Sequence, residues 1–196
     1  MMTIRCTREL LRRLKAEVRR EPTCPTNRLG DCYAKLVSTK RGTLAICVSE
    51  RSLLPALVEA TKDTGAFVLA FREALRSVLH AIGAEPHWVQ REAQETEQIA
   101  LGTTASRHIL GSLNDLAFLA RATIEDHPHV DLVALAVELA DTPCSPLNYE
   151  TPRSVSLALL RPRALVVDRD GDTGNKPIKR RGVRSGGAVH RPAGPR

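Results

Sequence analysis

The stretch CYAKLVSTKRGTLAICVSE, residues 32–50, predicts a β-hairpin and with it the fold class. Two runs rich in apolar and β-branched residues, 32–39 and 43–50, flank the short basic turn KRG. Gly42 in this turn can adopt the left-handed backbone conformation that a tight reversal needs. Alternation along the second run places Leu44, Ile46 and Val48 on one face of its strand. We therefore expect a small sheet led by this hairpin.

Helical patterns surround the hairpin in the sequence. The most regular spans 64–83, where Phe67, Phe71 and Leu75 share one side and Gly83 ends the helix. Further helices are predicted over 8–20 after Thr7 as N-cap, over 51–63 with Pro55 in the first turn, and over 87–98 as a polar, exposed helix. Two more are predicted over 130–141 and 151–160, and short strands over 2–6 and 99–104. These elements predict a single α+β domain over residues 1–160, with a central hairpin packed by several helices.

Composition and charge set the wider limits on this chain of 196 residues. The hydrophobic share of 42% is enough for a core, and the whole net charge of +7 falls on residues 161–196. That segment is rich in Gly, Pro and Arg, so we predict a disordered basic tail. No apolar run approaches the roughly 20 residues of a membrane span, and the beginning of the chain turns charged early. The sequence therefore predicts a cytoplasmic location.

The basic residues raise the question of nucleic-acid binding. In the helix predicted over 8–20, four cations form a stripe away from the apolar side, and the tail adds a basic block. No aromatic residue is interleaved with them to stack on bases, and a simple solvated face is the alternative. The candidate nucleic-acid-binding residues are Arg8, Arg12, Lys15, Arg19, Lys179, Arg180 and Arg181.

A polar cluster interrupts the apolar stretch HILGSLNDLAFLARA, residues 108–122. Its members are His108, Ser112, Asn114 and Asp115. The favoured interpretation is a capping box, in which Ser112 and Asp115 satisfy backbone amides at a helix start. The alternative is one continuous helix from about Arg107, which aligns His108, Ser112 and Asp115 in a row. These are the residue types of a hydrolase triad, but a triad needs groups that converge from different elements.

The sequence lacks the common motifs of nucleotide-binding proteins, metalloproteases and serine hydrolases. The chain has no P-loop, no dinucleotide-binding glycine pattern, no H-E-x-x-H and no G-x-S-x-G, so no cofactor is predicted. Five cysteines without a C-x-x-C pair indicate neither a disulfide framework nor a zinc site. His127 and His129 flank Pro128 but lack a third ligand at a defined spacing, so no metal site is predicted.

Several blocks of the sequence resemble an uncharacterised bacterial domain family of unknown function. They are IRCTRELLRRL, YAKLVSTKRGTLAICVSERSLLPALV, HILGSLNDLAF and the pattern L..LA.ELADTPCSPLNY. The resemblance covers about residues 1–160. Family members typically read R-C-T-K-K-L-L, then W-Y-A-N-L, then L-G-S-M-N-D-F. Cys32 stands where the family tends to have Trp, and Lys35 stands where it has Asn. The resemblance implies a domain boundary near residue 160 and supplies no activity.

Three functional hypotheses follow. The first is a non-catalytic interaction module that binds nucleic acid through the basic helix and tail. The second is a small enzyme with a polar site around Ser112, Asn114 and Asp115, which requires these side chains to face a cleft with another polar element opposite. The third is a module for a protein partner, which an exposed apolar patch on the domain would favour.

Overall fold

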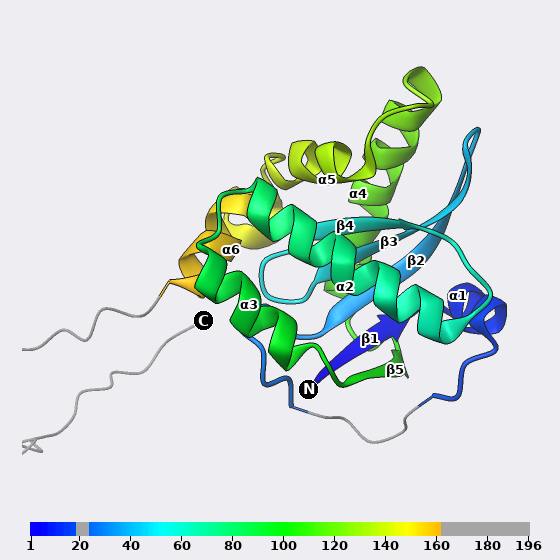
Figure 1. Ribbon diagram of the computed structural model, residues 1–196. Helices are drawn as coiled ribbons and strands as arrows, with labels where there is room; N and C mark the ends of the chain where they lie inside the picture. Colours follow the sequence, from blue (N-terminus) through cyan, green and yellow to red (C-terminus); the bar gives the residue numbers. More distant parts are fainter. Residues whose placement is uncertain (19–23, 162–196) are drawn as a thin grey trace, which may run out of the picture. The chain divides into compact units, whose positions relative to one another are not determined.

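The computed structural model describes residues 1–18 and 24–161, which form an α+β domain around a five-stranded mixed sheet (Figure 1). The strand order is β4-β3-β2-β1-β5. Strand β1 (Met2–Cys6) runs parallel to both of its neighbours, β2 (Cys32–Thr39) and β5 (Ile99–Thr103). Strands β2, β3 (Gly42–Ser49) and β4 (Pro55–Glu59) form an antiparallel meander. The predicted hairpin is confirmed, with Thr39 opposite Gly42 at its turn.

Helices cover both faces of this sheet. Helix α2 (Thr64–Ala81) packs on the face to which Cys32 points, because its Phe71 lies in the same buried cluster of side chains as Cys32. Helix α4 (Arg107–Asp126) packs on the opposite face, where its Asn114 contacts Lys35. Cys32 and Lys35 are three positions apart on β2, so alternation places them on opposite faces. The remaining helices are α1 (Arg8–Leu14), α3 (Pro86–Glu95), α5 (Leu132–Ala140) and α6 (Pro152–Leu160), and Ser145–Leu147 forms a 3₁₀ turn.

The predicted helix over 51–63 is wrong, because Pro55–Glu59 is the strand β4. Pro55 opposes Val48 and stands at the first position of an edge strand, where its missing N–H removes no essential ladder bond. The four residues from Pro55 to Val58 are all buried. A short apolar run that is buried on both sides has no period that separates strand from helix.

Helix α1 is shorter than predicted. It begins after Thr7 and ends at Leu14, and Lys15 turns into the left-handed conformation with φ 50°. Leu10 and Leu14 are buried, whereas Val18, the next apolar residue of the stripe, is exposed. Without apolar surface to bury, a further turn gains too little to offset its ordering entropy.

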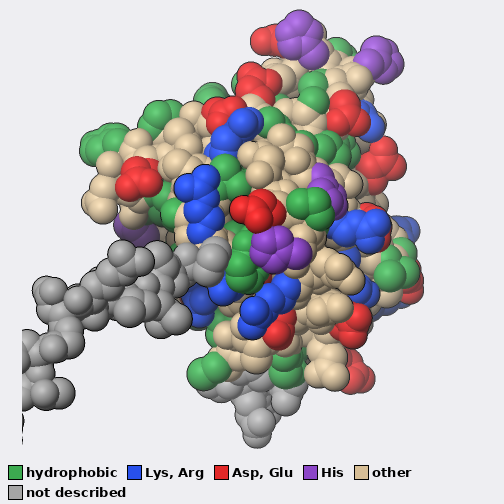
Figure 2. All heavy atoms as spheres, turned by 60° about the vertical axis from the view of Figure 1, so that its left-hand side comes forward, with side chains coloured by type: hydrophobic (Ala, Val, Ile, Leu, Met, Phe, Trp, Pro, Cys, Tyr) green, Lys and Arg blue, Asp and Glu red, His purple; other side chains and the backbone are tan. Residues whose placement is uncertain are grey.

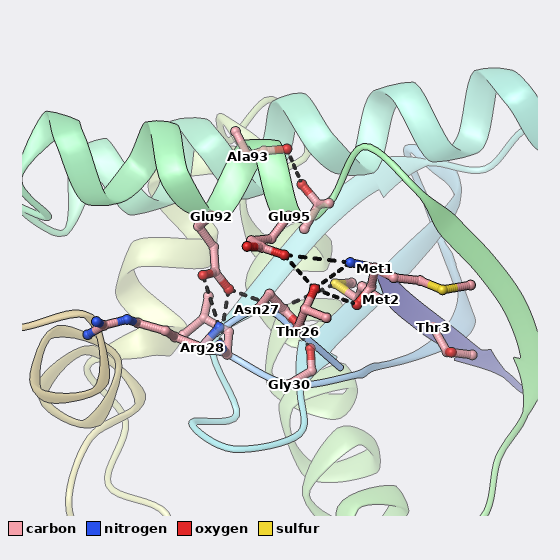
Figure 3. Close-up of polar contacts among 12 residues, drawn as sticks. Met1, Met2, Thr3, Thr26, Asn27, Arg28, Gly30, Glu92, Ala93 and Glu95 are labelled. Atoms are coloured by element: carbon pink, nitrogen blue, oxygen red, sulfur yellow. Dashed lines mark hydrogen bonds and ion pairs between the residues drawn. The ribbon is translucent and has the colours of Figure 1, made fainter. Parts of the chain in front are cut away.

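Helix α3 is less exposed than predicted, because Val89 and Glu92 are buried. The Glu92 carboxylate accepts hydrogen bonds from Asn27 Nδ2 (3.0 Å), Arg28 N (3.1 Å) and Leu29 N (3.0 Å). Figure 3 shows Glu92 with its partners Asn27 and Arg28. The three hydrogen bonds fasten the loop before β2 to the helix. A buried carboxylate of this kind is stable only when N–H donors replace its water. Glu92 is therefore an anchor of the fold.

The predicted disordered tail lies outside the described residues from position 162 onward. Arg19, Lys179, Arg180 and Arg181 lie outside them as well. Among the residues that the structure describes, no helix combines the length and the apolar character that a membrane crossing requires.

Candidate functional site

Helix α4 carries the polar cluster noted in the sequence, and it is continuous from Arg107 to Asp126. The predicted capping box at Ser112 is therefore wrong. The cap is Ser106, whose hydroxyl oxygen accepts a hydrogen bond from the Ile109 amide (3.4 Å). Starting the helix there lets Ile109 pack against the core and extends the helix by six residues, 107–112. These gains exceed the roughly 1 kcal/mol that Gly111 costs inside a helix.

A cavity of about 430 Å³ lies beside α4. This is within the range of sites that bind small molecules or single side chains of a partner. One wall is α4, and the opposite wall is the loop after α5, residues 142–146 with Tyr149. We call this cavity the α4 cleft. Its helical wall consists of His108, Gly111, Ser112, Asp115, Leu116 and Leu119.

The helical geometry explains this wall. At 100° per residue, positions 108, 112, 115 and 119 follow one another along a single flank of the helix. His108, Ser112 and Asp115 are thus brought together on one side of the cleft, as the continuous-helix interpretation requires. Asn114 lies on the opposite flank, where its Oδ1 accepts a hydrogen bond from Lys35 Nζ (2.7 Å). It is the one member of the predicted cluster that does not line the cleft.

The loop wall is held rigidly. Backbone hydrogen bonds close the loop on itself, from Cys144 N to Glu150 O (3.1 Å) and from Tyr149 N to Cys144 O (3.0 Å). An ion pair between Arg153 and Asp141 (2.8 Å) ties the start of α6 to the end of α5 across the base of the loop. A wall that is fixed in advance needs little ordering when a ligand binds.

Two consecutive residues of the loop are strained. Asn148 and Tyr149 have φ angles of 54° and 64°, in the left-handed region that costs a non-glycine residue about 1–2 kcal/mol. The Tyr149 side chain that this backbone presents is 76% exposed and lines the cleft. Strain of this kind persists where the surrounding structure imposes it, often at binding sites. The loop therefore holds an aromatic ring in solvent at the mouth of the α4 cleft.

The electrostatics of the cleft are dominated by Asp115. Among the residues that the structure describes, no lysine or arginine lines the cleft, and His108 is the one basic side chain of the lining. Burial, and secondarily the negative charge of Asp115, raise the pKa of the Cys144 thiol on the opposite wall. This thiol donates a weak hydrogen bond to Thr142 O (3.4 Å). A thiol with a raised pKa holds little thiolate at neutral pH and is a poor nucleophile.

No catalytic relay is assembled in the α4 cleft. Among the described residues, no hydrogen bond joins His108, Ser112 and Asp115 to one another. The three lie in a row on one helix, and the facing loop supplies apolar groups, hydroxyls and a protonated thiol. Without a hydrogen bond to a base, a serine hydroxyl is a weak nucleophile. The arrangement can bind a ligand but does not activate Ser112.

An apolar patch at the mouth of the cleft could not be predicted from the sequence. Leu119 on α4 and Tyr149 on the loop wall both line the cleft and are 38% and 76% exposed. We call these two side chains the mouth patch. Phe118 is 72% exposed but lies on the flank of α4 that carries Asn114, so it does not belong to the patch. In the sequence, Leu119 reads as a core residue of a helix, and Tyr149 stands alone in a loop. Only the facing of α4 and the loop joins them.

The candidate nucleic-acid residues of α1 lie on the surface. Arg8, Arg12 and Lys15 are exposed, and no ion pair joins them to other described residues. Because the helix ends at Leu14, the stripe of four cations does not form on one continuous helix. On the face shown in Figure 2, acidic and basic side chains are interspersed. Nucleic-acid binding through α1 stays a prediction.

Comparison with protein families places this geometry in a known group of sequences. Residues 3–155 match the model of a domain of unknown function, DUF6933. The chain belongs to this family. The matched range contains both walls of the α4 cleft. The blocks HILGSLNDLAF and L..LA.ELADTPCSPLNY that resemble the uncharacterised family contain every lining residue except Leu119. The comparison with curated proteins and that with solved structures gave no match.

Proposed function

We propose that this DUF6933 domain is a non-catalytic interaction module that binds a segment of a partner protein at the α4 cleft. The observation that carries the proposal is the continuity of the cleft with the mouth patch. Leu119 and Tyr149 face each other from the two walls of the cleft and are 38% and 76% exposed. Covering one such side chain contributes about 1.5–3 kcal/mol, so a partner that spans the mouth gains from each of them.

A partner segment fits these features better than a substrate does. The cavity volume of about 430 Å³ accommodates one or two side chains, and the patch outside it offers surface for their neighbours. Aromatic side chains at the edge of a rigid pocket are the usual anchors of protein interfaces. The row of His108, Ser112 and Asp115 supplies hydrogen-bonding groups that orient a ligand without a chemical step.

Selection from a displayed library of random twelve-residue peptides tests the proposal on the full chain. Peptides that bind the wild-type protein are then measured against Leu119→Ser and Tyr149→Ser. We expect each variant to lose at least about tenfold in affinity, equivalent to about 1.4 kcal/mol. The matched control is Leu69→Ser, because Leu69 is 60% exposed on α2, away from the cleft. Peptides that bind the Tyr149→Ser variant as well as the wild type would refute the proposal.

Nucleic-acid binding is the second candidate function. It is favoured by the exposure of Arg8, Arg12 and Lys15 without ion-pair partners among the described residues. Cations of this kind bind phosphates by releasing counterions, without reading sequence. The two functions use different surfaces and can be tested with separate variants.

A further inference from the structure

We infer that the α4 cleft receives the side chain of an arginine from the partner segment, with Asp115 as its counterion. The inference rests on the proposed function and names the chemistry that the cleft selects. It begins with the charges of the lining. Asp115 is the one acidic lining residue, and it makes no hydrogen bond or ion pair with any described residue. A carboxylate ligand would place a second negative charge against it.

The other charges near the cleft are already engaged or lie at its edge. Asp141 is paired with Arg153 (2.8 Å), and the Glu150 side chain accepts a hydrogen bond from Ser154 Oγ (3.3 Å). His108 is the one lining group that can carry a positive charge, and it precedes Asp115 by two turns of α4. Asp115 is therefore the acidic group of the described lining that has no hydrogen-bond or ion-pair partner.

The charge of Asp115 acts across the cleft and not only on its own helix. The Cys144 thiol on the loop wall has a raised pKa, to which the Asp115 carboxylate contributes after burial. A cation between the two walls would meet this field directly. Asp115 is itself exposed, so we expect an ion pair with it to be modest in strength and to weaken with salt.

The shape and polarity of the walls suit a long basic side chain. Leu116, Leu119 and Pro143 provide apolar surface along which a three-carbon stem can lie. The exposed Tyr149 ring at the mouth offers a face for a guanidinium. Arginine fits better than lysine, because its planar guanidinium presents five N–H donors to a carboxylate and to neighbouring hydroxyls. Ser112, Thr142 and Ser145 supply those hydroxyls.

The test uses three blocked tripeptides, Ac-Leu-Xaa-Leu-NH2, with arginine, citrulline or glutamate in the centre. Citrulline keeps the shape of arginine and removes its charge. Binding to the ¹⁵N-labelled full chain is followed by amide NMR shifts around the cleft. We expect the arginine peptide to bind about fivefold more tightly than the citrulline peptide, and the glutamate peptide to bind most weakly. Increasing the salt concentration should reduce the difference in affinity between the arginine and citrulline peptides.

Asp115→Asn should abolish the preference for arginine over citrulline while the citrulline peptide binds as before. The matched control is Asp126→Asn, because Asp126 is an exposed acid at the far end of the same helix and does not line the cleft. The inference is overturned if arginine and citrulline peptides bind wild type equally, or if Asp115→Asn keeps the preference. In that case, if the proposed function holds, Leu119→Ser still lowers the affinity for both the arginine and the citrulline peptide. Absence of cleft shifts with every peptide would reject both.

Discussion

Replacing Glu92 by alanine should destabilise the domain strongly, because this carboxylate fastens the loop before β2 to helix α3. Glu92 is 2% exposed and accepts three N–H donors at 3.0–3.1 Å. Two of them, Asn27 Nδ2 and Leu29 N, are themselves buried, and the third, Arg28 N, is partly buried. An unsatisfied buried donor costs about 1–3 kcal/mol. Two such donors, with the third regaining water, give an expected loss of about 3–4 kcal/mol.

The isosteric change Glu92→Gln should cost less, about 2 kcal/mol, because one oxygen acceptor remains while the new amide N–H faces a donor. Urea unfolding of the full chain measures both changes. Trp88, the one tryptophan of the sequence, precedes Glu92 by one turn of α3 and reports on the same region by fluorescence. The Arg28 guanidinium stacks on its ring at 4.3 Å, so release of the loop should also change the Trp88 emission of the folded protein.

The matched control is Glu97→Ala, an exposed glutamate just beyond the same helix, for which we expect a change within about 0.5 kcal/mol. For a domain of this size, 3–4 kcal/mol lowers the melting temperature by about 10 °C. A loss below about 1 kcal/mol for Glu92→Ala would refute the reasoning. It would mean that the three donors find water or other acceptors when the carboxylate is removed.

Three further predictions address other parts of the molecule. Gly30→Ala should destabilise the domain by about 1–2 kcal/mol, because Gly30 has φ 80° and a Cβ there would lie 3.0 Å from Arg51 Cγ. Gly111→Ala on α4 should instead stabilise it by about 0.5–1 kcal/mol, because a Cβ at Gly111 would meet open space. A higher melting temperature for Gly30→Ala than for Gly111→Ala would contradict this reasoning. Burial raises the pKa of the Cys6 thiol above its ordinary value of about 9, and Cys47 adds to the shift. Since the unfolded chain then loses this proton first, stability should be complete below about pH 8 and fall above pH 9 by up to about 1.4 kcal/mol per pH unit. Urea midpoints between pH 7.5 and 10.5 measure this slope. Cys6→Ala should reduce it without abolishing it, because a hydrogen bond with Cys32 and burial also raise the pKa of the Cys47 thiol. If α1 binds nucleic acid, the double variant Arg8→Glu/Arg12→Glu should bind DNA and RNA oligonucleotides more weakly than the wild type. The control double variant Arg72→Glu/Arg76→Glu on α2 should bind them as the wild type does. Equal affinities of the two double variants would show that α1 is not the binding surface.

Local patterns explain the elements that the sequence predicted correctly. The hairpin over 32–50 and helix α2 each combine a regular period with a glycine at the turn or end, so neighbouring residues carry the whole signal. Strand β4 lacks such a signal. Its apolar run is a strand because it pairs with β3. The residues of the run alone do not predict this pairing.

In the candidate site, too, local patterns predicted some features and the tertiary structure decided others. The residues His108, Ser112 and Asp115 stand out in the sequence, and their spacing is compatible with one helix flank. Whether they cap a helix or line a cleft depends on where the helix begins. Ser106 and the burial of Ile109 decide that question, because a longer helix buries more apolar surface. The sequence favoured the capping box at Ser112, which is wrong. A capping motif can be recognised in the local sequence, whereas the burial of Ile109 depends on the whole fold.

By itself, the sequence determined the class of fold, the hairpin, most helices and the polar residues of α4, because these follow from periodicity and turn chemistry within about 20 residues of chain. The tertiary structure alone decided that the loop of residues 142–149 faces α4, that Asn114 turns away toward Lys35, and that Leu119 and Tyr149 line the same cleft. The physical reason is that a cleft is a relation between surfaces. Its two walls are set by how α4 and α5 pack against the sheet, and that packing depends on contacts between residues far apart in the chain.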